Sequence, residues 1–272
     1  MSYTRLIPVL LFDDGAIWRS QEFSRHYRLG DPIMQLERYK VWDVDEIVYL
    51  DMHRGPNGKR LLDFLPEIAR NCFAPLATGG GVRTLEDIHN HLTLGADRVV
   101  INTAAFDDPG FVAEASHRYG AQAIVVSIDA KYHADGYEVV VDSGRRPTGK
   151  RVEDWAAEAA ARGAGEIFIN SIDRDGMGQG YDTALVQRVS SRVHVPVIAC
   201  GGVGKFEHFP AGVLKGGAGA VAASNIFAFT ELSYLDAKDS MARAGVKVRT
   251  SRPADLKRYA LKELNMDALL AV

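Results

Sequence analysis

Short apolar runs alternate with longer stretches of helix-like spacing along the whole chain. The apolar runs are mostly rich in Val and Ile and have the length of buried strands. They predict strands at Arg5–Leu11, Glu46–Asp51, Leu76–Thr78, Arg98–Ile101, Ala123–Asp129, Glu166–Asn170, Val197–Ala199 and Ala220–Ala222. Helical patterns lie between them, for example at Leu61–Asn71, Thr84–Leu94, Val152–Arg162 and Thr183–Ser191. Strict alternation predicts a parallel sheet with right-handed crossovers, and eight repetitions favour closure into a barrel.

The two halves of the chain resemble each other. TGGGVRTLEDIHNHLTLGADRVVINTAAF in the first half is similar to ACGGVGKFEHFPAGVLKGGAGAVAASNIF in the second. The repeat aligns Gly80 with Gly201 and Thr103 with Ser224. Such a unit is too long for a solenoid repeat. Two like halves predict a single (β/α)₈ barrel with a twofold internal repeat.

The chain has 272 residues, and barrels commonly reach about 250 residues as one unit. No linker rich in Pro, Gly or Ser divides it. We therefore expect the barrel over residues 1–249 and a C-terminal extension over residues 250–272. Pro253–Leu264 has amphipathic spacing, and we expect a helix packed on the barrel rather than a partner-binding element.

Composition and charge exclude several classes of protein. A net charge of −3 gives no electrostatic footprint for nucleic acid or an anionic membrane. The apolar stretch from Leu6 to Phe12 is too short to span a bilayer and lacks a signal-peptide cleavage pattern. Cys72 and Cys200 cannot make a disulfide scaffold, and no histidine pair has the spacing of a metal site. We expect a cytoplasmic protein without a metal, a cofactor, or a nucleic-acid or membrane partner.

Two glycine turns are candidate anion sites. Gly80–Gly81 and Gly201–Gly202 each follow an apolar run and precede a helix, where backbone N–H groups can approach an anion. Alternatively, the glycines only shape the turns. Because each turn has a polar residue at the next strand exit, we favour two phosphate sites on opposite sides of the barrel mouth. A substrate with a phosphate at both ends, or one long phosphorylated ligand, would suit them.

Carboxylates end or follow three predicted strands. Asp51, Asp129 and Asp175 are expected at the barrel mouth, where burial can raise the pKa of a carboxyl group and make it useful for proton transfer. For Asp51 and Asp175 the alternative is capping of the next helix. Asp129 is the expected general acid or base. Arg19 and Lys131 either bind substrate anions or are solvated surface residues.

A charged residue stands at the start of four predicted strands: Arg5, Glu46, Arg98 and Glu166. On a closed barrel these positions gather at the N-terminal end. Buried ion pairs rarely improve stability over apolar packing. The ring is therefore either an ionic plug or a gate between the barrel interior and a partner docked beneath.

Several motifs together resemble one family. DEIVYLD, GGG, INTAA, SIDAK, GAGEI, SIDRDGMGQGYD, GGVGKFEHF and AAS are similar to the cyclase subunit of imidazole glycerol phosphate synthase, from about Arg5 to Arg249. The resemblance implies that a glutaminase docks on the N-terminal face and supplies ammonia. Ammonia then passes through the barrel to a bis-phosphorylated substrate, which is cleaved and cyclised. It also implies that the charged ring is the ammonia gate and that Asp129 is one of two catalytic aspartates.

The resemblance assigns one phosphate to Gly81, Asn102 and Thr103, and the other to Gly202, Ala223 and Ser224. The full set expected to bind phosphate or substrate is Arg19, Asp51, Gly80, Gly81, Asn102, Thr103, Asn170, Asp175, Gly176, Gly201, Gly202, Ala223 and Ser224.

The chain departs from this family at the first strand. The family pattern is C-L-D-V-K-D-G, whereas this sequence has VLLFDDG, so Leu11 stands where the second catalytic aspartate should be. Asp13 has the same strand parity, but two residues of strand place it about 6–7 Å further out. Loss of a general acid or base typically costs roughly 10²- to 10⁴-fold in rate.

This departure, together with MHRG, IPVLL and NCFAPLATGGG, resembles a paralogous branch. Such barrels occur with a glutaminase and a sugar amidotransferase in the amidation of surface-polysaccharide sugars, where the barrel is thought to deliver ammonia. That role needs no full acid/base pair, so the sequence favours it over true cyclase activity. A barrel that only binds a phosphorylated metabolite as a scaffold remains a third hypothesis.

Overall fold

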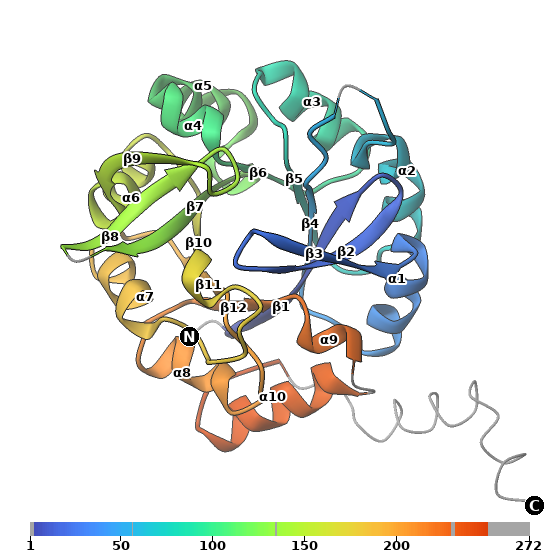
Figure 1. Ribbon diagram of the computed structural model, residues 1–272. Coiled ribbons are helices and arrows are strands. Elements are labelled where there is room, and N and C mark those ends of the chain that lie inside the picture. Colours follow the sequence, from blue (N-terminus) through green and yellow to red (C-terminus); the bar gives the residue numbers. More distant parts are fainter. Residues whose placement is uncertain (1–2, 56, 134, 230–231, 250–272) are drawn as a thin grey trace, which may run out of the picture.

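Parallel strands close into a barrel in the computed structural model (Figure 1), which describes residues 3–55, 57–133, 135–229 and 232–249. In these residues the barrel strands are β1 (Arg5–Asp13), β4 (Ile47–Asp51), β5 (Leu76–Gly79), β6 (Arg98–Ile101), β7 (Ile124–His133), β10 (Glu166–Ser171), β11 (Val197–Cys200) and β12 (Ala220–Ala223). Each pairs in parallel with its neighbours, and β12 closes the ring on β1. The predicted (β/α)₈ barrel is confirmed.

Helices surround the barrel (Figure 1). They are α1 (Pro32–Val41), α2 (Leu61–Asn71), α3 (Leu85–Thr93), α4 (Thr103–Asp107), α5 (Pro109–Tyr119), α6 (Val152–Ala161), α7 (Thr183–Ser190), α8 (His208–Leu214), α9 (Ile226–Phe229) and α10 (Ser233–Arg243). Short 3₁₀ turns lie at Ala121–Ala123 and Ile172–Arg174. Local sequence explains several helix starts: Asp31 accepts hydrogen bonds from the first turn of α1, and Thr84 forms a capping box with Asp87 in α3.

Strand side chains alternate between two apolar layers. The inner layer fills the barrel with residues such as Ile7, Val48 and Phe168. The outer layer packs between the strands and the helices and includes the fully buried Trp155. Along β1 the inward set continues to Leu11, which packs against the inner layer. Leu11 therefore faces the barrel interior, as its strand parity predicts.

Two β-hairpins extend the barrel at its C-terminal end. The first, β2 (Ala16–Gln21) and β3 (Arg25–Gly30), continues from β1 and lies across the barrel opening (Figure 1). The second, β8 (Gly136–Val141) and β9 (Arg146–Arg151), continues from β7. Neither hairpin was expected from the sequence, because β3 and β9 lack the apolar alternation of a half-buried strand.

The predicted extension, residues 250–272 with its helix Pro253–Leu264, lies outside the described residues. Among the residues that the structure does describe, no helix is long and apolar enough to cross a membrane.

Candidate functional site

A cavity of about 830 Å³ opens at the C-terminal ends of the barrel strands. Its lining brings together many of the residues that the sequence singled out: Asp51, Gly80, Gly81, Asn102, Thr103, Asp129, Asn170, Asp175 and Ser224. The lining draws on both halves of the chain. The expectation that strand ends converge on one bowl therefore agrees with the geometry, while the role of each residue stays a prediction.

Asp129 lies in β7 and is buried in this cavity. Burial raises the pKa of its carboxyl group to about 7, although hydrogen bonds from the amides of Asn102 and Asn170 act in the opposite direction. The Asn102 Nδ2 atom donates to Asp129 Oδ2 at 2.8 Å. A carboxyl group with a pKa near neutral is suited to both accept and donate a proton.

Asp175 lies where the first hairpin meets the opposite side of the cavity. Burial raises the pKa of its carboxyl group. The backbone N–H of Phe23 donates to its carboxylate at 3.3 Å, and the N–H of Glu22 donates to its backbone carbonyl at 2.9 Å. Gly176 is packed under the same hairpin, since a Cβ there would lie 2.3 Å from the Ser20 carbonyl oxygen. Asp175 thus holds the hairpin over the barrel mouth.

The two glycine turns have the same left-handed backbone. Gly80 and Gly81 have φ values of +97° and +73°, and the matching Gly201 and Gly202 have +91° and +102°. The internal repeat therefore extends to the conformation of its turns. A Cβ on Gly80 would lie 2.0 Å from the Asp51 carbonyl oxygen, so the close approach as well as the dihedral requires glycine.

A Gly80→Ala substitution is expected to destabilise the protein by about 2–5 kcal/mol. About 1–2 kcal/mol comes from the left-handed conformation, and about 1–3 kcal/mol from the overlap with the Asp51 backbone. Gly149→Ala is the matched control, because Gly149 has a φ of +72° but open space around the position of a Cβ. Urea unfolding measures both. Equal losses in the two variants would contradict the overlap at Gly80.

The two turns differ in their access to the cavity. Gly80 and Gly81 line it, whereas Gly201, Gly202, Ala223 and Gly176 are not among its lining residues. Gly202 packs against the loop between β10 and α7, and its carbonyl accepts from the Gly180 N–H at 2.7 Å. The second phosphate site is represented in the lining by Ser224. Phosphate binding at either turn stays a prediction.

Arg19 lies on β2 and is also absent from the cavity lining. Its guanidinium stacks 4.4 Å from the ring centroid of Tyr27 and 5.4 Å from that of Phe229. This places it on the hairpin in cation–π contact with two exposed rings. Lys131 is exposed on β7 beyond Asp129. Substrate binding by Arg19 or Lys131 stays a prediction.

The Asp51 carboxylate accepts hydrogen bonds from three residues. Its Oδ2 atom accepts from the Arg60 Nε atom at 2.8 Å and from the N–H of Leu61, the first residue of α2, at 3.1 Å. Its Oδ1 atom accepts from the His53 N–H at 2.8 Å. The helix-capping alternative considered for Asp51 is thus realised, and the same carboxylate also orients an arginine at the edge of the cavity.

Several lining residues had no signal in the sequence. They come from loops: His53, Arg54, Arg60, Arg83 and Arg145. Arg60 lies close to the first glycine turn, since a Cβ on Gly81 would be 2.8 Å from its Nη2 atom. The MHRG segment, read from the sequence only as a departure from a family pattern, supplies His53 and Arg54.

One buried acceptor in the cavity wall lacks a partner in the described part of the chain. The Oδ1 atom of Asn170 is inaccessible to solvent and makes no hydrogen bond there. Buried polar atoms normally have a partner, so this acceptor is an exception to that rule. The described residues contain no group of three or more His, Cys, Asp or Glu side chains placed to hold a metal ion.

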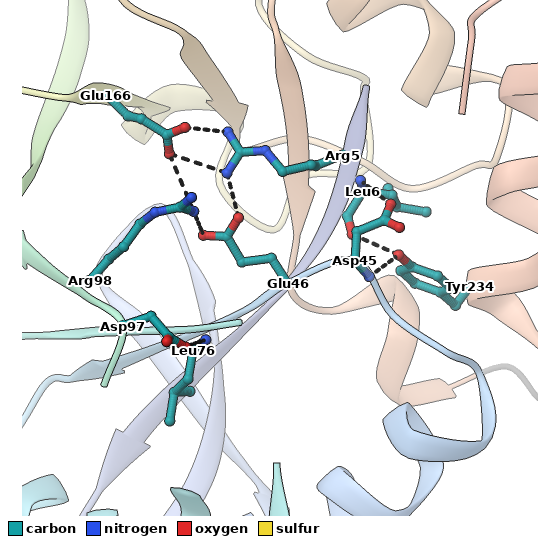
Figure 2. A network of polar contacts seen from close by, with 9 residues as sticks. All are labelled: Arg5, Leu6, Asp45, Glu46, Leu76, Asp97, Arg98, Glu166 and Tyr234. Atoms are coloured by element: carbon teal, nitrogen blue, oxygen red, sulfur yellow. Dashed lines mark hydrogen bonds and ion pairs between the residues drawn. The ribbon is translucent and has the colours of Figure 1, made fainter. Parts of the chain in front are cut away.

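The four basal charges form one network at the other end of the barrel (Figure 2). Arg5 forms an ion pair with Glu46 and donates to Glu166 at 2.5 Å, and Arg98 donates to Glu46 at 2.7 Å. Glu46 is 1% exposed, whereas the side chains of Arg5 and Arg98 are about a quarter exposed. The predicted ring is present and closed by its own ion pairs.

The fold and the cavity define a class of protein: a two-halved (β/α)₈ barrel with a buried carboxyl group in its mouth and an ionic ring at its base. Residues 5–231 match the model of a family described as "Histidine biosynthesis protein". The chain is 43% identical over 252 residues to the imidazole glycerol phosphate synthase subunit HisF of Caulobacter vibrioides strain NA1000 / CB15N, covering 92% of this chain and 97% of the relative.

It is likewise 43% identical over 251 residues to the subunit of the same name from Hyphomonas neptunium, covering 92% of this chain and 100% of the relative. The chain therefore belongs to the HisF family of histidine biosynthesis proteins. The resemblance to the cyclase family is confirmed at this level, and these relatives give no support to the paralogous sugar-amidation branch.

Proposed function

We propose that this chain is the cyclase subunit of an imidazole glycerol phosphate synthase. In this role it accepts ammonia from a glutaminase and uses it to cleave and cyclise a bis-phosphorylated substrate. The observation that carries the proposal is Asp129. Its buried carboxyl group lies in the cavity at the barrel mouth and has a pKa of about 7. The full-length matches to subunits named for this synthase support it.

Asp129 supplies the proton transfer that ammonia addition needs. When the nitrogen lone pair of ammonia bonds to an electrophilic carbon, the nitrogen becomes positively charged and must lose a proton. The ionised Asp129 carboxylate accepts that proton. The amide of Asn102 fixes its orientation through the 2.8 Å hydrogen bond. A base of this pKa is about half ionised at neutral pH, which suits both halves of a proton exchange.

The cavity has groups suited to phosphate at one side. A left-handed turn such as Gly80–Gly81 is suited to direct backbone N–H groups at an anion, and the Arg60 guanidinium lies next to Gly81. Asn102 and Thr103 line the same region. The corresponding turn in the second half would take the second phosphate once the loop over Gly202 moves. A substrate with a phosphate at each end then spans the mouth.

The glutaminase partner is expected on the opposite face. Arg5, Glu46, Arg98 and Glu166 separate that face from the barrel interior, and their network would have to open for ammonia to enter. Above the ring the interior is lined by small and branched apolar side chains such as Ala77, Val100 and Ala220. Such a lining offers ammonia few competing hydrogen bonds.

Leu11 favours a second candidate function. It lines the cavity at the position where the family pattern has its second catalytic aspartate, and a leucine cannot transfer a proton. A barrel that only delivers ammonia, for amidation of a surface-polysaccharide sugar by a sugar amidotransferase, would not need that group. The comparisons favour the cyclase, and this single residue favours delivery.

One assay separates the two candidates. The purified chain is given ammonium salts and the bis-phosphorylated cyclase substrate, and release of imidazole glycerol phosphate is measured. The cyclase proposal expects turnover without any partner protein. No turnover, together with glutamine-dependent sugar amidation that requires this barrel, would replace the cyclase by the delivery function. Adding the glutaminase and glutamine in place of ammonium salts then tests the basal ring as an entrance.

A further inference from the structure

An imidazole ring lies on the side of the cavity that carries Leu11. His53 follows β4, and its side chain is 13% exposed. Its Nδ1 atom lies 2.7 Å from Asp13 Oδ1 at the end of β1, and its Nε2 atom lies 2.6 Å from the backbone oxygen of Asn57. Leu11, Asp13 and His53 line the same cavity as Asp129.

Both partners of the ring are hydrogen-bond acceptors. A carboxylate and a carbonyl oxygen can only accept, so both ring nitrogens of His53 must donate, and a ring that donates twice is an imidazolium. The hydrogen bond to Asp13 raises the pKa of His53, and the Asn57 carbonyl acts in the same direction. Geometry and the direction of the pKa shift therefore both favour the protonated imidazole.

The groups around the ring come from three elements. From β1 and its turn come Asp13 and Asp14, and Asp14 accepts from the Lys59 N–H at 2.9 Å. From β4 comes Asp51, which accepts from the His53 backbone N–H. From the following loop come the cations of Lys59 and Arg60, and the charge of Arg60 lowers the pKa of His53. The nearest ionised contact of the ring itself is Asp13.

The loop is built closely around the imidazole. A Cβ on Gly58, whose φ is +124°, would lie 2.6 Å from the Cε1 atom of His53, and one on Gly55 would lie 3.2 Å from Nε2. The ring is thus held by backbone on one side and by Asp13 on the other. Such a fixed, charged donor at a cavity wall is the arrangement that a general acid requires.

We propose that His53 is the proton donor of this site, complementing Asp129, and that Asp13 is the residue that positions and charges it. This rests on the proposed cyclase function and names the group that acts in a cavity where Leu11 cannot. Asp13 acts through its hydrogen bond to His53 and need not reach the substrate.

The proton balance is complete with these two groups. As the substrate's carbon–nitrogen bond breaks, the electron pair goes to the leaving nitrogen, and His53 gives that nitrogen its Nε2 proton and becomes neutral. The carboxylate of Asp129 takes a proton from the added ammonia and becomes neutral. Solvent then reprotonates His53 and takes the proton from Asp129. In the step, the leaving nitrogen replaces the Asn57 carbonyl as the partner of Nε2.

The test compares His53→Gln and Asp13→Asn with wild type in ammonium-dependent turnover. His53→Gln is expected to lower kcat by about 10²- to 10⁴-fold with little change in KM. His133→Gln is the matched control, since it removes an imidazole that lies 3.1 Å from the carboxylate of Glu138 outside the cavity lining. It is expected to leave kcat unchanged. Asp13→Asn is expected to shift the alkaline limb of the pH–rate profile to lower pH.

A structural role for the ring makes a different prediction. If His53 only fastened the loop, its loss would raise KM and lower the unfolding midpoint while kcat and the pH profile stayed the same. That pattern would overturn the proposal. The Leu11→Asp change in the His53→Gln background is expected to recover at least about tenfold of the lost kcat, because it returns a proton donor to the same wall.

The inference and the function it rests on fail in distinguishable ways. If the wild-type protein does not turn over the cyclase substrate, both the cyclase proposal and the assignment of His53 as donor are wrong. If the wild type is active and the His53→Gln variant is equally active, only the assignment of His53 as donor is wrong. An NMR titration of the His53 ring is an independent test. A pKa at or below the ordinary value of about 6.5 would contradict the assignment of His53 as an imidazolium, whatever the turnover.

Discussion

Asp129→Asn is expected to lower ammonium-dependent turnover by about 10²- to 10⁴-fold while leaving the barrel folded. Asparagine has nearly the same shape and can still accept the hydrogen bond that Asn102 donates at 2.8 Å, but it cannot exchange a proton. The loss should fall on kcat rather than on KM. Asp239→Asn is the control, because Asp239 is an exposed carboxylate on α10 paired with Arg243. A variant as active as wild type would remove Asp129 from the chemistry.

The same substitution makes a prediction about stability and pH. The pKa of Asp129 is about 7 in the folded chain, above the value of about 3.9 expected when it is unfolded. Between these values the unfolded chain releases the proton while the folded chain keeps it. The contribution of Asp129 to stability is therefore complete below about pH 4 and is lost as the pH rises to about 7.

The Asp129→Asn variant does not lose stability as the pH rises in this way, because asparagine does not ionise. Above about pH 7 the Asp129→Asn variant should be more stable than wild type by up to roughly 4 kcal/mol, from about three pKa units at about 1.4 kcal/mol each. At pH 4 the two should be nearly equal. Chemical unfolding at several pH values measures the difference. A gap independent of pH would mean that the folded pKa is ordinary. A gain in stability beside a loss of rate is the usual trade-off at an active site.

The sequence predicts the barrel well because its strands carry their own signal. The run EIFINS is apolar and flanked by helical patterns, and it forms β10 at Glu166–Ser171, next to the predicted Glu166–Asn170. The helix Leu61–Asn71 has the predicted bounds. By contrast, β3 has the sequence RHYRLG, and most of its side chains are exposed, so its polar pattern resembles that of a loop. Antiparallel pairing with β2 creates this strand, and local periodicity does not predict that pairing.

The same distinction applies to the site. Asp129 and Asn170 could be predicted because closure of a parallel barrel brings the C-terminal ends of all strands to one mouth. Leu11 could be placed because strand parity fixes which side chains face inward. His53 could not, because its position depends on the loop after β4 and on a hydrogen bond to Asp13, forty residues earlier along the chain. Strand spacing places Asp13 too far out to replace the missing aspartate, and in the structure it contacts His53 instead.

Glu46→Ala is expected to destabilise the protein by about 3–5 kcal/mol. Glu46 is 1% exposed and pairs with both Arg5 and Arg98, so its removal leaves two guanidinium groups that share Glu166 alone. Breaking a buried network by removing one partner costs this much because the remaining charges stay desolvated and unpaired. Urea unfolding should show a lower midpoint with an unchanged slope.

The control is Asp239→Ala, which removes one partner of the exposed Arg243–Asp239 pair and should cost less than about 1 kcal/mol. Glu46→Gln should fall between the two, because the amide oxygen still accepts from one arginine. A loss at Glu46 no larger than at Asp239 would mean that the ring is hydrated and contributes little. If the ring is also an entrance for ammonia, Glu46→Gln should change turnover with glutamine and the glutaminase. Turnover with ammonium salts should stay the same, because dissolved ammonia reaches the cavity from the barrel mouth and does not pass the ring.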